Sequence, residues 1–275
     1  MKFRTVIWDT YQECLGKKVL LIYPLLSTLV ILSLTFLIRV NISEGRALIS
    51  AFFGGDSTVM GLSKMQEVLL GAEGAIAVAL YTAGLYLSVF ATADLVPGMM
   101  QRGRLDLYLS RPISRPMLLF GRFTGATAII TANVLYAVIG IWLVVGIKTG
   151  LWNFSFFYAA GAIIFMFVVL YSLMMLVGIL SGSTAVTIII TYVVMAISPL
   201  LSNRGAIDAI INSAWVRGTL DILYWCLPKY SEVTTMVYKL ASGGEIESWT
   251  PLLSSMLTGF VLFQITIILF SRRDI

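Results

Sequence analysis

The stretch GRLDLYLSRPISR at residues 103–115 decides how this chain is organised, because it is a charged, proline-broken island between two long apolar runs. A polar segment this short between apolar runs must lie at a water interface. Arginines gather in and beside it, at Arg102, Arg104, Arg111, Arg115 and Arg122. Since loops rich in lysine and arginine stay on the cytoplasmic side of a membrane, we expect this loop to face the cytoplasm.

The composition of the whole chain indicates an integral membrane protein. Of its 275 residues, 59% are hydrophobic and 12% are charged, and the mean hydropathy is +0.92. Soluble domains are about one-half apolar and one-quarter charged. The length leaves room for several spans of about 20 residues, but not for a second soluble domain. The net charge of +5 is therefore interpreted by how it divides between the two sides of a membrane, and not as a sign of nucleic-acid binding.

Apolar runs long enough to span a bilayer recur on both sides of the loop. Inside lipid such runs must form helices, because a helix satisfies its own backbone. The sequence predicts an all-α membrane protein with one transmembrane domain over residues 1–275. Its six spans are expected at about 19–38, 74–93, 123–146, 154–180, 185–201 and 252–270.

Three further segments have an amphipathic pattern. Residues 2–16 place apolar side chains at helical spacing with charges between them, which predicts an interfacial helix. The regions 43–73 and 203–251 are semi-apolar, and the second is rich in tryptophan and tyrosine. We expect helices in the outer interface there, divided at Pro228 in the second region.

The charges favour a topology with both termini in the cytoplasm. The inner segments hold 11 of the 19 basic residues, whereas the outer segments hold 9 of the 14 acidic residues. An alternative joins the fourth and fifth runs, which only residues 181–184 separate, into one span. That would leave five spans and an external C-terminus, and Arg272 and Arg273 argue against it.

The loop itself has the pattern of a docking helix. Leu105, Tyr108 and Leu109 fall on one face of a short helix that ends before Pro112. Arg102, Asp106 and Arg115 supply charge around that face. An apolar ridge with a polar rim fits a groove in a partner protein. Alternatively, the arginines only anchor the loop at anionic headgroups, a role compatible with docking.

The residues around the loop resemble a known family. The run Gly103, Leu105, Leu107, Leu109, Ser110, Pro112, Ile113, Ser114 and Arg115, followed by Leu118, Leu119, Gly121 and Phe123, resembles the cytoplasmic loop of type-2, export-class ABC transporter permeases. The Leu227-Pro228 pair and the basic tail at residues 270–274 add to the resemblance. There are departures, because Met99, Met100 and Gln101 replace acidic residues and Arg104 replaces threonine. Asp94 and Asp106 are candidates for the missing acidic contacts.

The resemblance implies a multi-pass subunit of the cytoplasmic (inner) membrane, whose loop at about 97–116 carries a coupling helix between spans 2 and 3. That helix would dock on a separately encoded ABC ATPase dimer that binds ATP and Mg, beside a second permease copy or homologous permease. The implied coupling residues are Arg102, Gly103, Leu105, Asp106, Tyr108, Leu109, Ser110, Arg111, Pro112, Ser114 and Arg115.

Catalytic and metal sites are not expected in this chain. No GxxxxGK[ST] loop is present, so any ATP hydrolysis must come from a partner. There is no histidine, and Cys14 and Cys226 are predicted on opposite sides of the membrane, so neither a disulfide nor a metal site is expected. The span centres lack charged residues, which argues against an ion-coupled secondary transporter.

Polar residues in the spans leave two interpretations open. Asn133, Gln264 and Tyr81 could line a translocation path, or they could only bond neighbouring helices. The amphipathic outer regions also support a second hypothesis for the whole protein. In it, the same ATPase-driven subunit moves a periplasmic or envelope protein instead of a solute. Nothing in the sequence selects a substrate.

Overall fold

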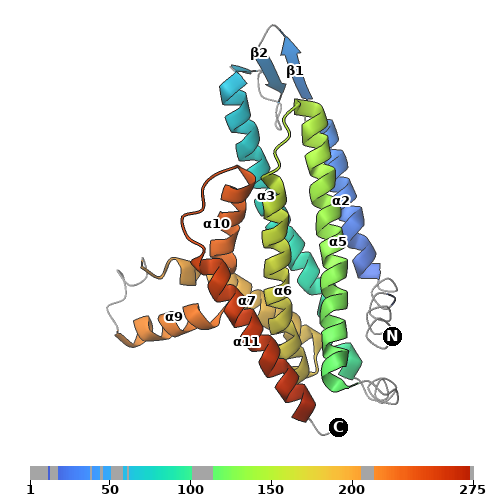
Figure 1. Cartoon of the computed structure of the whole chain (residues 1–275), viewed down its shortest axis with the longest axis vertical. Coiled ribbons are helices and arrows are strands. Elements are labelled where there is room, and N and C mark those ends of the chain that lie inside the picture. Colours follow the sequence, from blue (N-terminus) through green and yellow to red (C-terminus); the bar gives the residue numbers. More distant parts are fainter. Residues whose placement is uncertain are drawn as a thin grey trace.

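The structure, a computed structural model, describes Gln12 and residues 18–37, 39–43, 46–50, 58–60, 62–100, 114–205 and 214–272. The predicted interfacial helix at 2–16 lies outside these residues except for Gln12. The described chain is mainly a bundle of long helices, which run between an end with the small sheet and an end with the C-terminus (Figure 1). We call these the sheet end and the inner end, and the second name follows the orientation that the charges predict.

The long helices lie over the predicted apolar runs. They are α2 (Lys18–Leu37), α3 (Leu62–Thr92), α5 (Arg115–Thr149), α6 (Phe156–Ser181), α7 (Thr184–Ser202) and α11 (Thr250–Arg272). Five described segments are long and apolar enough to cross a membrane, namely Glu67–Met100, Arg115–Thr149, Phe156–Ser181, Thr184–Ser202 and Thr250–Arg272. The apolar part described for α2, Ile22–Phe36, is shorter.

The local sequence explains where several of these helices begin and end. α5 begins at Arg115 with a proline in its first turn, where a missing N–H costs nothing, and it is 35 residues long. α6 ends at Gly182, whose φ of 63° lies in the left-handed region that favours glycine. The chain turns there and α7 starts at Thr184, so the fourth and fifth apolar runs form two helices and not one continuous span.

The second predicted span is longer than its hydropathy suggested. α3 begins at Leu62, well before the expected start at residue 74. Lys64, Glu67 and Glu73 lower the hydropathy of this first part, but they are good helix formers, so the helix continues past the apolar stretch.

A small sheet occupies the start of the region 43–73, where amphipathic helices were expected. Strands β1 (Arg39–Ser43), β2 (Arg46–Ser50) and β3 (Thr58–Met60) pair antiparallel in that order. Val40 of β1 pairs with Ile49 of β2, and apolar and polar residues alternate along β1 at the period of two that is typical of strands. The predicted all-α class is therefore incomplete, because a three-stranded sheet accompanies the helical bundle.

α6 is the centre of the bundle. It packs on α11, α10 (Tyr230–Ala241), α5, α3 and α7, and most of its side chains are buried. Near its middle, Tyr171 stacks on Phe123 of α5, which in turn lies 4.6 Å from Phe263 of α11 between ring centroids. Such pairs add about 0.5–1.5 kcal/mol each beyond burial. α2 is peripheral, since it packs mainly on α5.

The region 203–251 forms two helices, as predicted from Pro228. α9 (Ala214–Cys226) ends before this proline and α10 begins after it. α10 does not rest on the outside of the bundle, because Val233 and Val237 are fully buried where it packs on α3 and α6. α9 instead projects from one side, and its Trp215 is 87% exposed (Figure 1).

Candidate coupling region and polar contacts between the helices

Most predicted coupling residues lie outside the described residues. Arg102, Gly103, Leu105, Asp106, Tyr108, Leu109, Ser110, Arg111 and Pro112 fall in this group, and their docking role stays a prediction. Ser114 and Arg115 are described. Ser114 is exposed in an extended conformation just before α5, and Arg115 is the first residue of that helix.

The base of the loop is buried in the bundle. After α3 the chain turns into the 3₁₀ helix η1 (Pro97–Met100), in which Pro97, Gly98 and Met99 are buried. This helix packs on α6 at Gly178, where an added Cβ would meet Pro97 Cδ at 3.2 Å. A side chain at this position would therefore press on the Pro97 ring.

A hydrogen bond fixes the same segment to α7. The Thr184 hydroxyl donates to Asp94 Oδ1 at 2.9 Å. Asp94 also accepts the backbone N–H of Gly98 through its carbonyl at 2.9 Å. Since Thr184 is the first residue of α7, the Asp94 carboxylate lies beside the N-terminus of that helix. The helix dipole stabilises a carboxylate in this position by about 0.3–1 kcal/mol. The Asp94 carboxylate, a candidate acidic contact to an ATPase, is thus engaged within this chain.

Arg122 corrects one expectation from the sequence. It was grouped with the loop arginines at the cytoplasmic surface, but it is only 1% exposed. The helical spacing explains this position, because Arg122 lies three and four residues after the buried Leu119 and Leu118 and shares their face of α5. Arg122 therefore belongs to the interior of the inner end.

The three predicted path residues lie in different surroundings. Tyr81 is fully buried, donates its hydroxyl to the Tyr230 carbonyl at 2.9 Å and stacks on the Tyr230 ring. Asn133 donates to the Ile129 carbonyl of its own helix at 3.0 Å. Gln264 is exposed on the outer surface of α11. These contacts favour helix-to-helix bonding for Tyr81, and they do not bring the three residues together.

Two further polar links were not predicted from the sequence. Asn153, in the turn between α5 and α6, donates to Glu73 Oε2 at 2.5 Å and to the Ala241 carbonyl at 2.7 Å. The Tyr192 hydroxyl of α7 donates to the Tyr86 carbonyl of α3 at 2.8 Å. Each partner lies at least 80 positions away along the chain, so neither pattern nor spacing could reveal it.

Charged and aromatic side chains cluster where α9 meets α10. Two cations lie close to the Tyr224 ring, with Arg204 Cζ at 3.5 Å and Lys229 Nζ at 3.9 Å from its centroid. Lys229 is 3% exposed, and burial lowers its pKa. Burial, with Glu232 as the second cause, raises the pKa of Tyr224 to about 12. This cluster orients α9 on the end of α7.

The five apolar segments that are long enough to cross a membrane define a multi-pass helical membrane protein. A family model described as ABC-2 family transporter protein matches residues 17–275. The chain therefore belongs to the ABC-2 transporter family, which confirms the resemblance seen around the loop. A search of curated proteins found no match. Members of this family are membrane components that generally work with a cytoplasmic ATPase.

Proposed function

We propose that this chain is the permease subunit of an ABC export complex in the cytoplasmic membrane, with its loop docked on a separate ATPase. The observation that supports this most directly is the family match over residues 17–275. The buried base of the loop agrees with it, because a docking element transmits force only when its root is fixed. Both termini would then lie in the cytoplasm.

The proposed coupling route runs from the loop into two helices. Movement of the docked loop would displace η1, and η1 is held to α6 at Gly178 and to α7 through Asp94 and Thr184. ATP binding would bring two ATPases together and so favour one packing of two permeases over another. The ATPase shifts this equilibrium only by its differential affinity for the two states.

Charge substitutions on the apolar ridge test the docking. Leu105→Asp and Leu109→Asp should leave the chain in the membrane but abolish copurification of an ATPase. Ser248→Asp is the matched control, since Ser248 is an exposed residue of the loop before α11, away from the inner end. The proposal is contradicted if an active ATPase copurifies with Leu105→Asp and Leu109→Asp as well as it does with Ser248→Asp and the unchanged chain.

A second candidate function is supported by the shape of α9. This helix projects from the bundle and exposes Trp215 and Ile222, a surface that a cell-envelope protein could cover (Figure 1). In this case the ATPase would move a partner protein and no solute. Purification in mild detergent distinguishes the two candidates, because a stable additional envelope protein favours the second and a bound solute between two permeases favours export.

A further inference from the structure

A groove opens between α6 and α11 toward the sheet end. The two helices approach closely lower down, where a Cβ added at Gly259 would lie 3.3 Å from Val169 Cα. From this contact they separate, as the tilt of α11 in Figure 1 shows. The loop between α10 and α11 closes the wide end, and Leu240 and Trp249 line the space beneath it.

The deeper half of this groove is apolar. It has a volume of about 320 Å³, and Ala162 and Phe165 of α6 face Leu252 and Met256 of α11 across it. Gly161 also lines it, and no atom lies within 4 Å of the position that a Cβ would take. Space of this kind, on helices that cross a membrane, suits a hydrocarbon chain and offers a water molecule no partners.

The shallower half is polar and continues from the first. It measures about 410 Å³ and includes Ser155, Gly243 and Glu245. Tyr158 and Trp249 line both halves, so the two form one amphipathic groove. Exposed aromatic residues of this kind mark the boundary between the hydrocarbon core and the headgroups.

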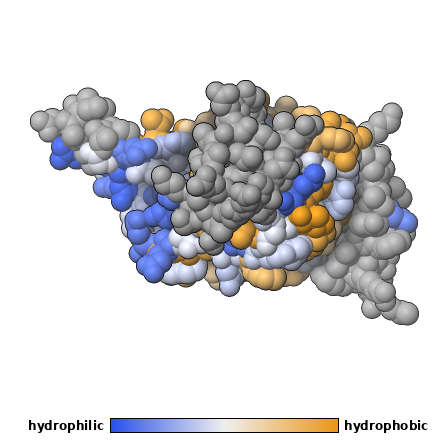
Figure 2. All heavy atoms as spheres, turned by 90° about the horizontal axis from the view of Figure 1, so that it is seen from above, coloured by the Kyte–Doolittle hydropathy of each residue, from blue (hydrophilic) through white to orange (hydrophobic). Residues whose placement is uncertain are grey.

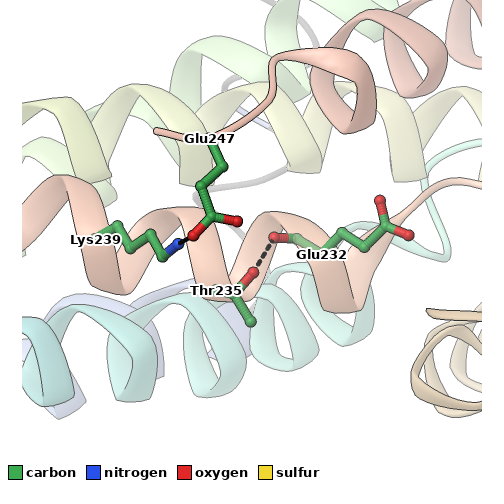
Figure 3. Close-up of polar contacts among 4 residues, drawn as sticks. All are labelled: Glu232, Thr235, Lys239 and Glu247. Atoms are coloured by element: carbon green, nitrogen blue, oxygen red, sulfur yellow. Dashed lines mark hydrogen bonds and ion pairs between the residues drawn. The ribbon is translucent and has the colours of Figure 1, made fainter. Parts of the chain in front are cut away.

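The polar half carries one negative charge. Glu247, the neighbouring acid in the loop, is occupied by an ion pair with Lys239 (Figure 3), which holds the pKa of Glu247 below its usual value. Glu245 lines the groove and forms no ion pair within the described chain. Seen from the sheet end, hydrophilic residues gather on the side of the bundle where α9 and this loop lie (Figure 2). The groove thus combines an apolar floor with an anionic mouth.

We propose that this groove binds a membrane phospholipid with an ammonium headgroup. One acyl chain would lie along Phe165 and Met256, and the ammonium group would lie beside the Glu245 carboxylate under Trp249. The carboxylate selects the headgroup by charge, and the aromatic rings of Tyr158 and Trp249 add attraction for a cation. This inference requires only that the chain spans a membrane, and it does not depend on ATPase coupling.

The test uses native mass spectrometry of the full chain extracted from vesicles of equal phosphatidylethanolamine and phosphatidylglycerol. The unchanged protein should retain phosphatidylethanolamine over phosphatidylglycerol by about fivefold, the ratio that ~1 kcal/mol of charge pairing in water gives. Glu245→Gln should bring the ratio close to one. Gly161→Leu should fill the apolar half and remove both lipids.

Two matched variants serve as controls. Glu67→Gln neutralises an exposed acid on α3, and Ala128→Leu enlarges an exposed side chain on α5, so both should behave like the unchanged protein. The proposal is overturned if the unchanged protein retains no lipid or shows no headgroup preference. It is overturned equally if Glu245→Gln keeps the preference, or if a protein segment occupies the groove in place of lipid.

Discussion

Thr184, the first residue of α7, holds Asp94 by a 2.9 Å hydrogen bond across 90 positions of sequence. This contact lies at the inner end of the bundle, where Asp94 is part of the short turn between α3 and η1. The segment that enters the loop is therefore attached to the start of another helix. In the proposed mechanism, movement of the loop would reach α7 through this contact.

Thr184→Val should weaken the attachment. The substitution keeps the size of the side chain and removes the donor, which costs about 1.5–3 kcal/mol for a hydrogen bond to a charged group. Hydrogen exchange at residues 93–100 should become faster, and substrate-stimulated ATP hydrolysis in the assembled complex should fall. Thr191→Val is the matched control, since the Thr191 hydroxyl bonds only to Thr187 in its own helix. Equal exchange in both variants would refute the role of this bond.

Gly178→Leu should disrupt the packing of η1 on α6. A Cβ at this position already meets Pro97 within 3.2 Å, so a larger side chain must displace the loop base. Overpacking of this kind costs about 1–3 kcal/mol. The melting temperature should decrease and ATPase copurification should weaken. Gly218→Leu, on α9 and in open space, is the matched control and should leave both unchanged.

Tyr81→Phe separates the two interpretations of this residue. The Tyr230 carbonyl keeps a hydrogen bond from Thr234, so loss of the Tyr81 hydroxyl should cost only ~0.5–1 kcal/mol. Thermal melting should show this small decrease while transport stays the same. A large change in transport with unchanged stability would instead place Tyr81 on a translocation path.

Lys229→Met should stabilise the protein at neutral pH. Because burial lowers the pKa of Lys229 from its usual value of 10.5, its charge disfavours folding below the folded-state pKa. The variant should melt about 2 °C higher at pH 7. The difference should narrow as the pH rises through the folded pKa toward 10.5, because the unchanged lysine then loses its proton. A difference that is constant between pH 7 and pH 10 would contradict this account.

The positions of the long helices could be predicted from the sequence because lipid requires long apolar helices, and hydropathy reports them directly. The beginning of α3 could not, since Glu67 and Glu73 interrupt the apolar pattern without interrupting the helix. The division of α9 from α10 followed from the ring of Pro228. The burial of α10 did not follow, because an amphipathic helix can place its apolar face on lipid or on protein.

The polar contacts of the site were beyond prediction for a different reason. Asn153 and Glu73 carry no motif, and only the packing of α3, α6 and α10 brings them within 2.5 Å. Arg122 illustrates the converse. Its charge suggested the surface, whereas its place on the buried face of α5 determined its position.

The length of α5 has a mechanical consequence. With 35 residues it extends about 52 Å, against a hydrocarbon thickness of ~30 Å. Its beginning at Arg115 borders the loop, and its other end lies at the sheet end, where α5 contacts β1 (Figure 1). Because α5 is one continuous helix, it is long enough to extend beyond the membrane. If its end beside the loop tilts, its other end would move outside the membrane on the opposite side.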